Sequence, residues 1–293
     1  MNTKIHRRSL LSRALLTGSA LGLSSLSPAA LAPSWGDDLS SIARDELAQQ
    51  RERREIVATF SIVACDPEHG EVGAAVASMY PSVGRVVPYV KAGIGAFCTQ
   101  HYHVPKWGEP ALAMLKEGKR PERVLAELLE SDPQPGARQL AIVNMKGEVA
   151  VHNPDTAPKE SSYWGAQTGK FYSCQGNTLT GREVIAGMAA AYEATEGSLA
   201  DRLMAALLAG DCAGGDHRGR LAAGIRVDKV REQDEAEFKL WLDLQVDRSD
   251  DAVIELAEAY AKLEHEAKGA WRGGKLPFQH PCKERPEPAP PTR

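Results

Sequence analysis

The chain changes character abruptly at Thr59, and this change constrains the fold more than any other feature. Residues 59–64 read Thr-Phe-Ser-Ile-Val-Ala, an alternation typical of a half-buried strand, and residues 72–78 form a second apolar run. The turn at residues 66–70, Asp-Pro-Glu-His-Gly, indicates a hairpin between them. Strands joined by so short a turn pair antiparallel. The sequence therefore predicts an antiparallel sheet that begins at Thr59.

The rest of the chain alternates between groups of strands and groups of helices. We expect further strands at 93–99, 139–144, 148–151, 171–175, 221–227 and 238–246, and helices at 110–116, 121–130, 182–194, 199–208 and 251–266. Because hairpins rather than single helices join the strands, two largely antiparallel sheets are favoured. With helices on their outer faces, the predicted class is α+β, a four-layer α-β-β-α sandwich.

The first 32 residues have the composition of an export signal. Arg7 and Arg8 precede a mildly apolar stretch at 14–26, and residues 30–32, Ala-Leu-Ala, supply a small-x-small cleavage pattern. The arginine pair predicts the twin-arginine export machinery as a partner; the alternative is a chance pair in an ordinary secretory signal. No later stretch approaches the ~20 apolar residues that span a bilayer, so we expect no membrane span after processing. The predicted location is periplasmic or secreted.

Four further segments follow the predicted signal peptide (1–32). Residues 33–58 are polar and strongly charged, which predicts a linker, a propeptide or a solvent-exposed helix. We assign 59–250 to the main domain, 251–282 to a C-terminal helical extension, and the proline-rich 283–293 to a disordered tail. The net charge of −4 is too small to indicate a nucleic-acid partner.

The five cysteines lie far apart in the sequence, which disfavours a metal or redox pair. Their odd number leaves at least one thiol unpaired. Buried reduced cysteines are the default expectation, one disulfide is compatible with the sequence, and no cysteine sits in a motif that would activate it.

Thr59 is a candidate nucleophile. A threonine hydroxyl needs a base, and in a chain that begins with threonine its own α-amine is that base. The α-amine has a pKa near ~8, against ~10.4 for lysine, so much of it can accept a proton at neutral pH. The competing interpretation is an ordinary β-branched residue on a strand.

Polar residues at other strand ends are candidate partners of Thr59. Asn177 follows a glycine, and an amide placed there can stabilise an oxyanion, which is typically worth ~3 kcal/mol. The alternative is that Asn177 is there as an ordinary turn residue, because asparagine is common in turns. Ser78, Gln100 and His101 fit the same logic more weakly.

Two other features could carry chemistry. His101 and His103 flank a tyrosine, but without a carboxylate at ligand spacing they do not predict a metal site. Residues 214–219 read Gly-Gly-Asp-His-Arg-Gly, a turn whose glycines allow positive φ and in which Asp216 and Arg218 can orient each other or a substrate. The alternative is a capped helix end followed by a surface turn. We predict no metal and no cofactor.

Six motifs in order resemble one family, the N-terminal-nucleophile (Ntn) hydrolase-like family catalogued as domain of unknown function 1028. They cover about residues 59–246. The motifs are Thr59–Ala64, Gly73–Ser78, Val83-Gly84 with Val87-Pro88, Gly93–Ala96 with Thr99-Gln100, Gln175–Asn177, and Ala213–Asp216 with Arg218-Gly219.

The resemblance implies the α-β-β-α sandwich and a site around Thr59 as nucleophile and base. By position, Asn177 resembles the oxyanion donor, and Asp216 and Arg218 resemble supporting or substrate-orienting groups. Members of the wider superfamily hydrolyse amide bonds. The family's own reaction is not established, so the resemblance names no substrate.

This chain departs from the family pattern ahead of Thr59. In family members the threonine usually follows the initiator methionine, whereas cleavage after Ala32 would leave 58 − 32 = 26 residues here. Either the Ala58–Thr59 bond is cut or the α-amine never forms. A second departure is the run Arg220–Ala223, where a more polar segment is expected.

Two functions follow as hypotheses. The first is an exported amidohydrolase whose Thr59 attacks a small amide after processing. The alternative is a non-catalytic periplasmic domain that binds a small ligand or a cell-wall component. A homo-oligomer is compatible with this architecture.

Overall fold

Two antiparallel sheets form the centre of the molecule. The computed structural model describes residues 56–57, 59–155, 161, 163–230 and 241–266. The first sheet has the order β1-β5-β6-β7, with β4 also paired to β5, and the second has the order β11-β10-β3-β2-β9-β8. Every described pairing is antiparallel, which confirms the predicted sheet type.

The strands alternate between the sheets along the chain. The first sheet consists of β1 (Ile56–Val57), β4 (Pro88–Lys91), β5 (Gly95–Tyr102), β6 (Arg138–Asn144) and β7 (Val149–His152). The second consists of β2 (Thr59–Asp66), β3 (Glu71–Ser78), β8 (Gly165–Gly169), β9 (Tyr172–Gly176), β10 (Ala222–Lys229) and β11 (Leu242–Val246).

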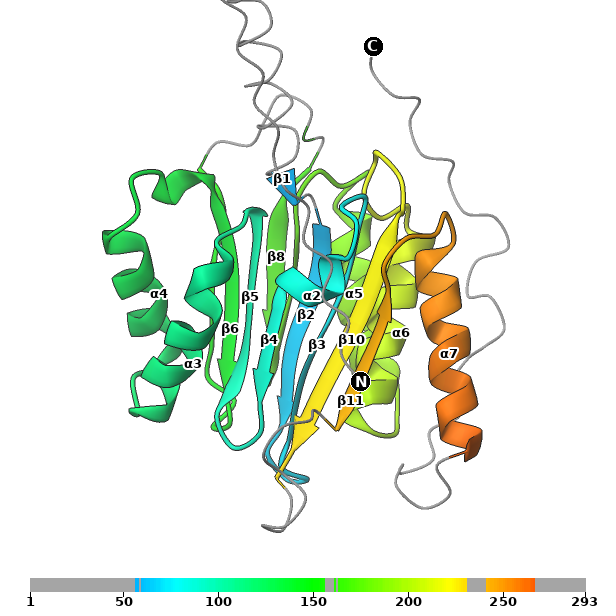
Figure 1. Cartoon of the computed structure of the whole chain (residues 1–293), viewed down its shortest axis with the longest axis horizontal. Helices are drawn as coiled ribbons and strands as arrows, with labels where there is room; N and C mark the ends of the chain where they lie inside the picture. The colour runs from blue at the N-terminus through cyan, green and yellow to red at the C-terminus, as the bar shows by residue number, and fades with distance from the viewer. Residues whose placement is uncertain (1–55, 58, 156–160, 162, 231–240, 267–293) are drawn as a thin grey trace, which may run out of the picture. The chain divides into compact units, whose positions relative to one another are not determined.

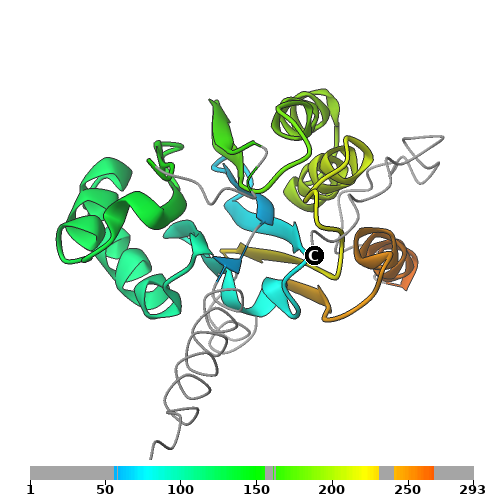
Figure 2. The same cartoon turned by 90° about the horizontal axis from the view of Figure 1, so that it is seen from above.

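Apart from the short helix at Val83–Val86, whose Val83 lies in the core between the sheets, the described helices pack on the sheet faces that the other sheet does not cover. In Figure 1 and, from above, in Figure 2, α3 and α4 lie beside the first sheet, and α5, α6 and α7 lie on the opposite side of the fold. The helices are α2 (Val83–Val86), α3 (Gly108–Lys116), α4 (Pro121–Glu130), α5 (Glu183–Ala194), α6 (Leu199–Cys212) and α7 (Ala252–Glu266). Two 3-10 turns, at Pro105–Trp107 and Pro135–Ala137, flank the α3–α4 pair.

The side chains of β2 show why the layers hold together. Phe60 and Ile62 lie in a core cluster with α5, α6 and α7, whereas Val63 and Cys65 lie in a second cluster shared with β4, β5 and β6. A third cluster joins the first sheet to α3 and α4. The expectation of a half-buried strand is wrong for β2, because the other sheet covers its second face and only Asp66 is not buried.

Several predicted elements differ from the structure at their ends. β4 and β8 were not predicted, and the segment expected to be linker or helix instead ends in strand β1. The open edge of β5 explains the difference, because the β-branched pair Ile56–Val57 can form ladder hydrogen bonds there. Of the predicted strand 238–246, residues 242–246 form β11, while residues up to 240 lie outside the described ones.

α7, predicted as an extension, shares the core of the second sheet. Val253, Leu256 and Tyr260 are fully buried in the cluster that contains Ile225 and Leu242. The signal peptide at 1–32, most of the segment 33–58 and the tail at 283–293 lie outside the described residues. In the part of the chain that is described, no helix has the length and apolar composition needed to cross a membrane.

Candidate functional site

Thr59 is the first residue of β2, a strand that lies inside the second sheet between β3 and β9. Its side chain has the same parity as Ser61, whose hydroxyl contacts β5 of the other sheet, so both face the space between the sheets. Thr59 is fully buried, pairs in register with Ser78, and its carbonyl accepts a hydrogen bond from the Asn177 backbone at 2.9 Å. A strand start therefore holds Thr59 by its backbone.

A buried amide network lies next to Thr59, with Gln139 of β6 at its centre. The Gln139 Oε1 accepts hydrogen bonds from Gln100 Nε2 at 2.8 Å and from Asn177 Nδ2 at 2.9 Å. Its Nε2 donates to the Gly176 carbonyl at 2.9 Å, which ties the two sheets together. Gln100 Nε2 also reaches the Thr59 carbonyl at 3.5 Å. Gln100, Gln139 and Asn177 are all fully buried.

The network continues beneath Thr59 through hydroxyl groups. Ser61 Oγ donates to Gln100 Oε1 at 2.5 Å and accepts from Gln175 Nε2 at 2.6 Å, while Ser173 Oγ donates to Gln175 Oε1 at 2.8 Å. Buried polar groups cost free energy unless they are paired, and these are paired with each other. The arrangement fixes the side chains around Thr59 in one geometry.

The glycine turn between α6 and β10 brings the carboxylate of Asp216 next to the end of β3. Gly214 and Gly215 have φ of 108° and 55°, and a Cβ on Gly215 would lie 2.8 Å from Phe60. Glycine is therefore required for both conformation and space. Asp216, fully buried, accepts from the Met79 backbone at 3.2 Å, immediately after Ser78 in β3.

Arg218 joins the site through Asp216. Its Nε and Nη2 donate to the two carboxylate oxygens at 3.1 and 2.9 Å, a bidentate pair. The nearby Arg220 pairs with buried Asp211 at the end of α6. The Arg220–Asp211 pair joins the end of α6 to the segment that precedes β10, while Asp216 is tied to the end of β3 through the Met79 N–H.

Two residues beside the site have left-handed backbone conformations. Thr178, which follows Asn177, has φ of 55° and donates from Oγ1 to Asn177 Oδ1 at 3.1 Å. His101, which follows Gln100, has φ of 66°. Non-glycine residues rarely adopt this region, and such strain concentrates at functional sites.

His101 is neutral at physiological pH and keeps one acceptor unused. Burial lowers the pKa of its imidazole, and the charges of Arg138 and Arg218 lower it further. Its Nδ1 lies 2.8 Å from the Ala137 carbonyl, which can only accept, so Nδ1 carries the hydrogen. The Nε2 atom is buried, and no group among the described residues forms a hydrogen bond with it.

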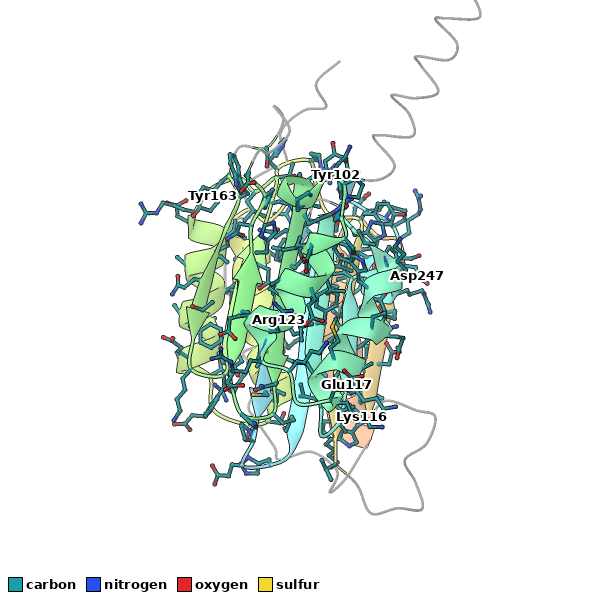
Figure 3. The ribbon with its side chains drawn as sticks, turned by 90° about the vertical axis from the view of Figure 1, so that its left-hand side faces the viewer. Tyr102, Lys116, Glu117, Arg123, Tyr163 and Asp247 are labelled. Carbon is teal, nitrogen blue, oxygen red and sulfur yellow. The ribbon has the colours of Figure 1, made fainter. Side chains whose placement is uncertain are left out.

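The candidate residues lie at one end of the two sheets and are closed to solvent. Thr59, Ser78, Gln100, Asn177 and Asp216 are each exposed by 1% or less, whereas Arg218 is about one third exposed. Tyr102, at the end of β5, and Tyr163, whose carbonyl accepts from Leu179, mark this end in Figure 3. Lys116 and Glu117 mark the opposite end.

The cysteines lie away from this cluster or are shielded from solvent. Burial raises the pKa of Cys65 and Cys98 to about 12 and raises that of Cys174 as well, and all three are free and buried. Cys212 is disulfide-bonded. Over the described residues, no three side chains of His, Cys, Asp or Glu are grouped so that they could hold a metal ion.

Comparison with known protein families shows which family the chain belongs to. The model of the family of unknown function DUF1028 matches residues 59–256. The chain belongs to this family. The matched region begins at Thr59, the first residue of β2, and ends within α7.

A solved DUF1028 structure has a similar fold. The crystal structure of a Silicibacter pomeroyi protein of this family aligns with a TM-score of 0.62 and 28% identity, covering 70% of this chain and 89% of that chain. No curated protein matches this chain.

In this DUF1028 chain, the structure brings most of the predicted site residues together. Thr59, Ser78, Asn177 and Asp216 meet at one end of the second sheet, and Gln100 joins them from β5. Arg218 joins them through its ion pair with Asp216.

Sequence reasoning missed the central residue of the amide network. Gln139 alternates along β6 with Ala141 and Val143, which face the other sheet, so its place on an inward face was readable. Its partners could not be read, because they depend on how the two sheets stack.

Proposed function

We propose that this chain is the precursor of an exported amidohydrolase of the Ntn type, with Thr59 as its nucleophile. One observation carries the proposal: Thr59 begins a central strand at the inter-sheet face, beside Asn177, Gln100 and Asp216. The stacking of two antiparallel sheets between helices supports assignment to the Ntn-hydrolase four-layer sandwich. The start of the family match at Thr59 supports a cut between Ala58 and Thr59.

In the proposed mechanism, the cut gives Thr59 a free α-amine. This amine takes the proton of the Thr59 hydroxyl as Oγ adds to the carbonyl carbon of the substrate amide. The proton then passes to the leaving nitrogen, the C–N bond breaks, and water hydrolyses the resulting ester on Oγ.

The amide network suits the support of this reaction. Asn177 Nδ2 donates one of its two hydrogens to Gln139. The second hydrogen is the candidate donor to the oxyanion, and such a donor typically stabilises the transition state by ~3 kcal/mol. Gln100 donates to Gln139 and to the Thr59 carbonyl, so we assign it the positioning of Thr59. We assign Asp216 and Arg218 a supporting role, because their ion pair is bonded to the backbone immediately after Ser78.

The proposal of export rests on the twin-arginine pattern and on Cys212. Structural disulfides persist mainly in oxidising compartments such as the periplasm, and Cys212 is disulfide-bonded. This observation supports a location beyond the inner membrane.

The closure of the site favours a second candidate. Because Thr59 is fully buried in the uncut chain, a protein that is never cut could not use it on a substrate. In that case a non-catalytic periplasmic binding domain for a small ligand or cell-wall component is the alternative function.

Hydrolysis separates the two candidates. Protein that begins at Thr59 is tested against acetyl-alanine amidomethylcoumarin, with Thr59→Ala and Thr59→Ser beside the wild type. We expect Thr59→Ala to lower kcat/KM by about a thousandfold or more and Thr59→Ser to retain part of it. Thr168→Ala, at an exposed threonine of β8, is the matched control. Equal rates for Thr59→Ala and wild type contradict the proposal.

A further inference from the structure

Three buried acids near the site end of the sheets are each paired with an arginine, and the arginine is always the more exposed partner. Tyr102, which marks this end in Figure 3, accepts from Arg138 through its carbonyl. In an ion pair whose acid is buried, the positive charge is the one that faces solvent and arriving ligands. The exposed fractions of the arginine and acid side chains are 30% and 0% for Arg218–Asp216, 14% and 3% for Arg138–Asp132, and 7% and 0% for Arg220–Asp211.

Arg218 differs from the other two arginines because part of its guanidinium is exposed and unused. All three guanidinium nitrogens of Arg138 donate hydrogen bonds, to Asp132 and to the Tyr102 carbonyl. Arg220 is nearly buried. Of these three arginines, Arg218 is therefore the one that a ligand can reach.

The pairing of Arg218 with Asp216 leaves one edge of the guanidinium open. Nε and Nη2 donate to the two carboxylate oxygens at 3.1 and 2.9 Å, which uses two of the five N–H groups. Among the described residues, none accepts a hydrogen bond from Nη1. The edge formed by Nη1 and the second hydrogen of Nη2 has the geometry to bind another carboxylate in bidentate form. Because Asp216 already fixes the guanidinium, little conformational entropy is lost when a ligand binds.

The guanidinium of Arg218 is connected to Thr59 by a short chain of contacts. Asp216 Oδ2, which accepts from Arg218, also accepts from the Met79 N–H at 3.2 Å. Met79 follows Ser78, and Ser78 pairs directly with Thr59 between β3 and β2. Paired residues of neighbouring antiparallel strands have Cα atoms about 5 Å apart. One strand spacing and two hydrogen bonds thus connect the candidate nucleophile to the open edge, so both belong to one site.

The charge of Arg218 also acts on the β5 side of the site. Burial lowers the pKa of the His101 imidazole, and the charges of Arg138 and Arg218 lower it further. His101 follows Gln100, whose Nε2 reaches the Thr59 carbonyl at 3.5 Å. Coulomb interactions weaken with distance, so the positive charge of Arg218 is felt within the site. A field that disfavours a cationic imidazole favours an anionic group of a ligand.

From these observations we propose that the open edge of Arg218 binds a carboxylate of the substrate. The substrate class is then a small amide that carries a carboxylate near the cleaved C–N bond, rather than a neutral amide. The carboxylate belongs either to the acyl part or to the amine part of the substrate, and the ligands chosen below distinguish the two. This inference rests on the proposed function for the reaction. Anion binding by Arg218 is independent of that function, because the guanidinium is already exposed in the uncut chain.

Binding tests the open edge without any catalysis. The full-length chain carrying Thr59→Ala is titrated, with detection by NMR, with two pairs of ligands in which the second member replaces the carboxylate by a neutral amide. Acetyl-alanine and acetyl-alaninamide place the group on the amine part, and succinamate and succinamide place it on the acyl part. We expect the carboxylate member of one pair to bind at least about tenfold tighter than its amide, because hydrogen bonds between charged groups are the stronger ones. Equal affinities within both pairs overturn the inference.

Two variants assign this preference to Arg218. Arg218→Gln should bring the two affinities of the preferred pair to within about twofold, whereas Arg123→Gln, at an exposed arginine of α4 labelled in Figure 3, should leave the preference intact. Because Arg218→Gln leaves the buried Asp216 carboxylate without its cation, Arg218→Gln combined with Asp216→Asn, which removes both charges, is measured as well. A tenfold preference that survives in either variant overturns the inference.

Turnover distinguishes this inference from the proposed function. Protein that begins at Thr59 is given the same four compounds, and the released acetate or ammonia is measured. We expect kcat/KM to be about tenfold or more higher for the carboxylate member of the preferred pair. Equal rates for carboxylate and amide overturn the carboxylate site and leave the hydrolase standing. No turnover of these compounds or of acetyl-alanine amidomethylcoumarin, with carboxylate-selective binding that depends on Arg218, removes the hydrolase and keeps Arg218 as an anion-binding residue.

Discussion

At the scale of single residues, the amide layer between the sheets determines how Thr59 is held. Gln139 Oε1 accepts from Gln100 and Asn177, and its Nε2 donates to the Gly176 carbonyl and to Asn153 Oδ1, so its hydrogen-bonding capacity is filled. Such a network stabilises the fold only when every member is paired. A buried polar group without a partner has lost its hydrogen bonds to water and has gained none in return.

Replacing Gln139 with leucine should therefore destabilise the fold strongly. Gln139→Leu leaves Gln100 Nε2, Asn177 Nδ2 and the Gly176 carbonyl each short of a partner, and we expect a loss of about 3 kcal/mol in the free energy of unfolding. Urea denaturation measures it. Gln167→Leu, at an exposed glutamine of β8, is the control and should change stability little. Equal losses for both variants would refute the role of the network.

His101 makes stability depend on pH. Its pKa is lowered in the folded protein by burial and by Arg138 and Arg218, so below the unfolded value of about 6.5 the unfolded chain binds the proton more readily. The free energy of unfolding should then fall through this residue as the pH drops below about 6.5. His101→Asn tolerates the left-handed backbone and should flatten this slope, whereas His69→Asn, at the exposed hairpin turn, should retain it. Identical slopes in wild type and His101→Asn would show that His101 does not contribute.

At the scale of elements, the glycine turn after α6 positions Asp216 and Arg218. Gly214 has φ of 108°, and a Cβ there would lie 2.5 Å from Thr180 Oγ1. Gly118, after α3, has φ of 89°, and its Cβ would meet nothing within 4 Å.

This pair separates backbone strain from collision. We expect Gly118→Ala to cost about 1 kcal/mol, from the positive φ alone, and Gly214→Ala to cost about 3 kcal/mol, because overpacking adds to the strain. Thermal unfolding of the two variants gives the difference. If Gly214→Ala is no worse than Gly118→Ala, the turn is not tightly packed against Thr180.

The same scale shows what the sequence can predict. Strands with a clear apolar pattern, such as β2, β3 and β6, were found because their period identifies them. The sequence does not predict β8, because Gly-Ala-Gln-Thr-Gly is partly exposed at a sheet edge and has no apolar alternation. The position of Thr59 followed from a strand start, whereas the bonds of Gln139 depend on the stacking of two sheets, which no local pattern encodes.

At the scale of the whole molecule, the three core clusters of apolar side chains exclude solvent from the interior. Cys65, Cys98 and Cys174 are fully buried, and burial raises the pKa of each. Only the thiolate reacts rapidly with alkylating agents.

These three thiols should resist labelling in the folded protein. At pH 8, iodoacetamide is expected to leave Cys65, Cys98 and Cys174 unmodified in the native chain and to modify all three in guanidinium chloride, as peptide mass spectrometry would show. Rapid labelling of any of them in the native protein would contradict the closed interior.

The proposed mechanism requires a cut at the bond ahead of Thr59, and the intact mass and N-terminal sequence of the exported protein test for it. The full-length wild type and Thr59→Ala are expressed side by side and recovered from the periplasm. We expect a wild-type chain that begins at Thr59 and a Thr59→Ala chain that keeps Ile56 and Val57 attached. A wild-type chain that also keeps these residues would contradict it, because Thr59 would then never gain the α-amine on which the mechanism depends.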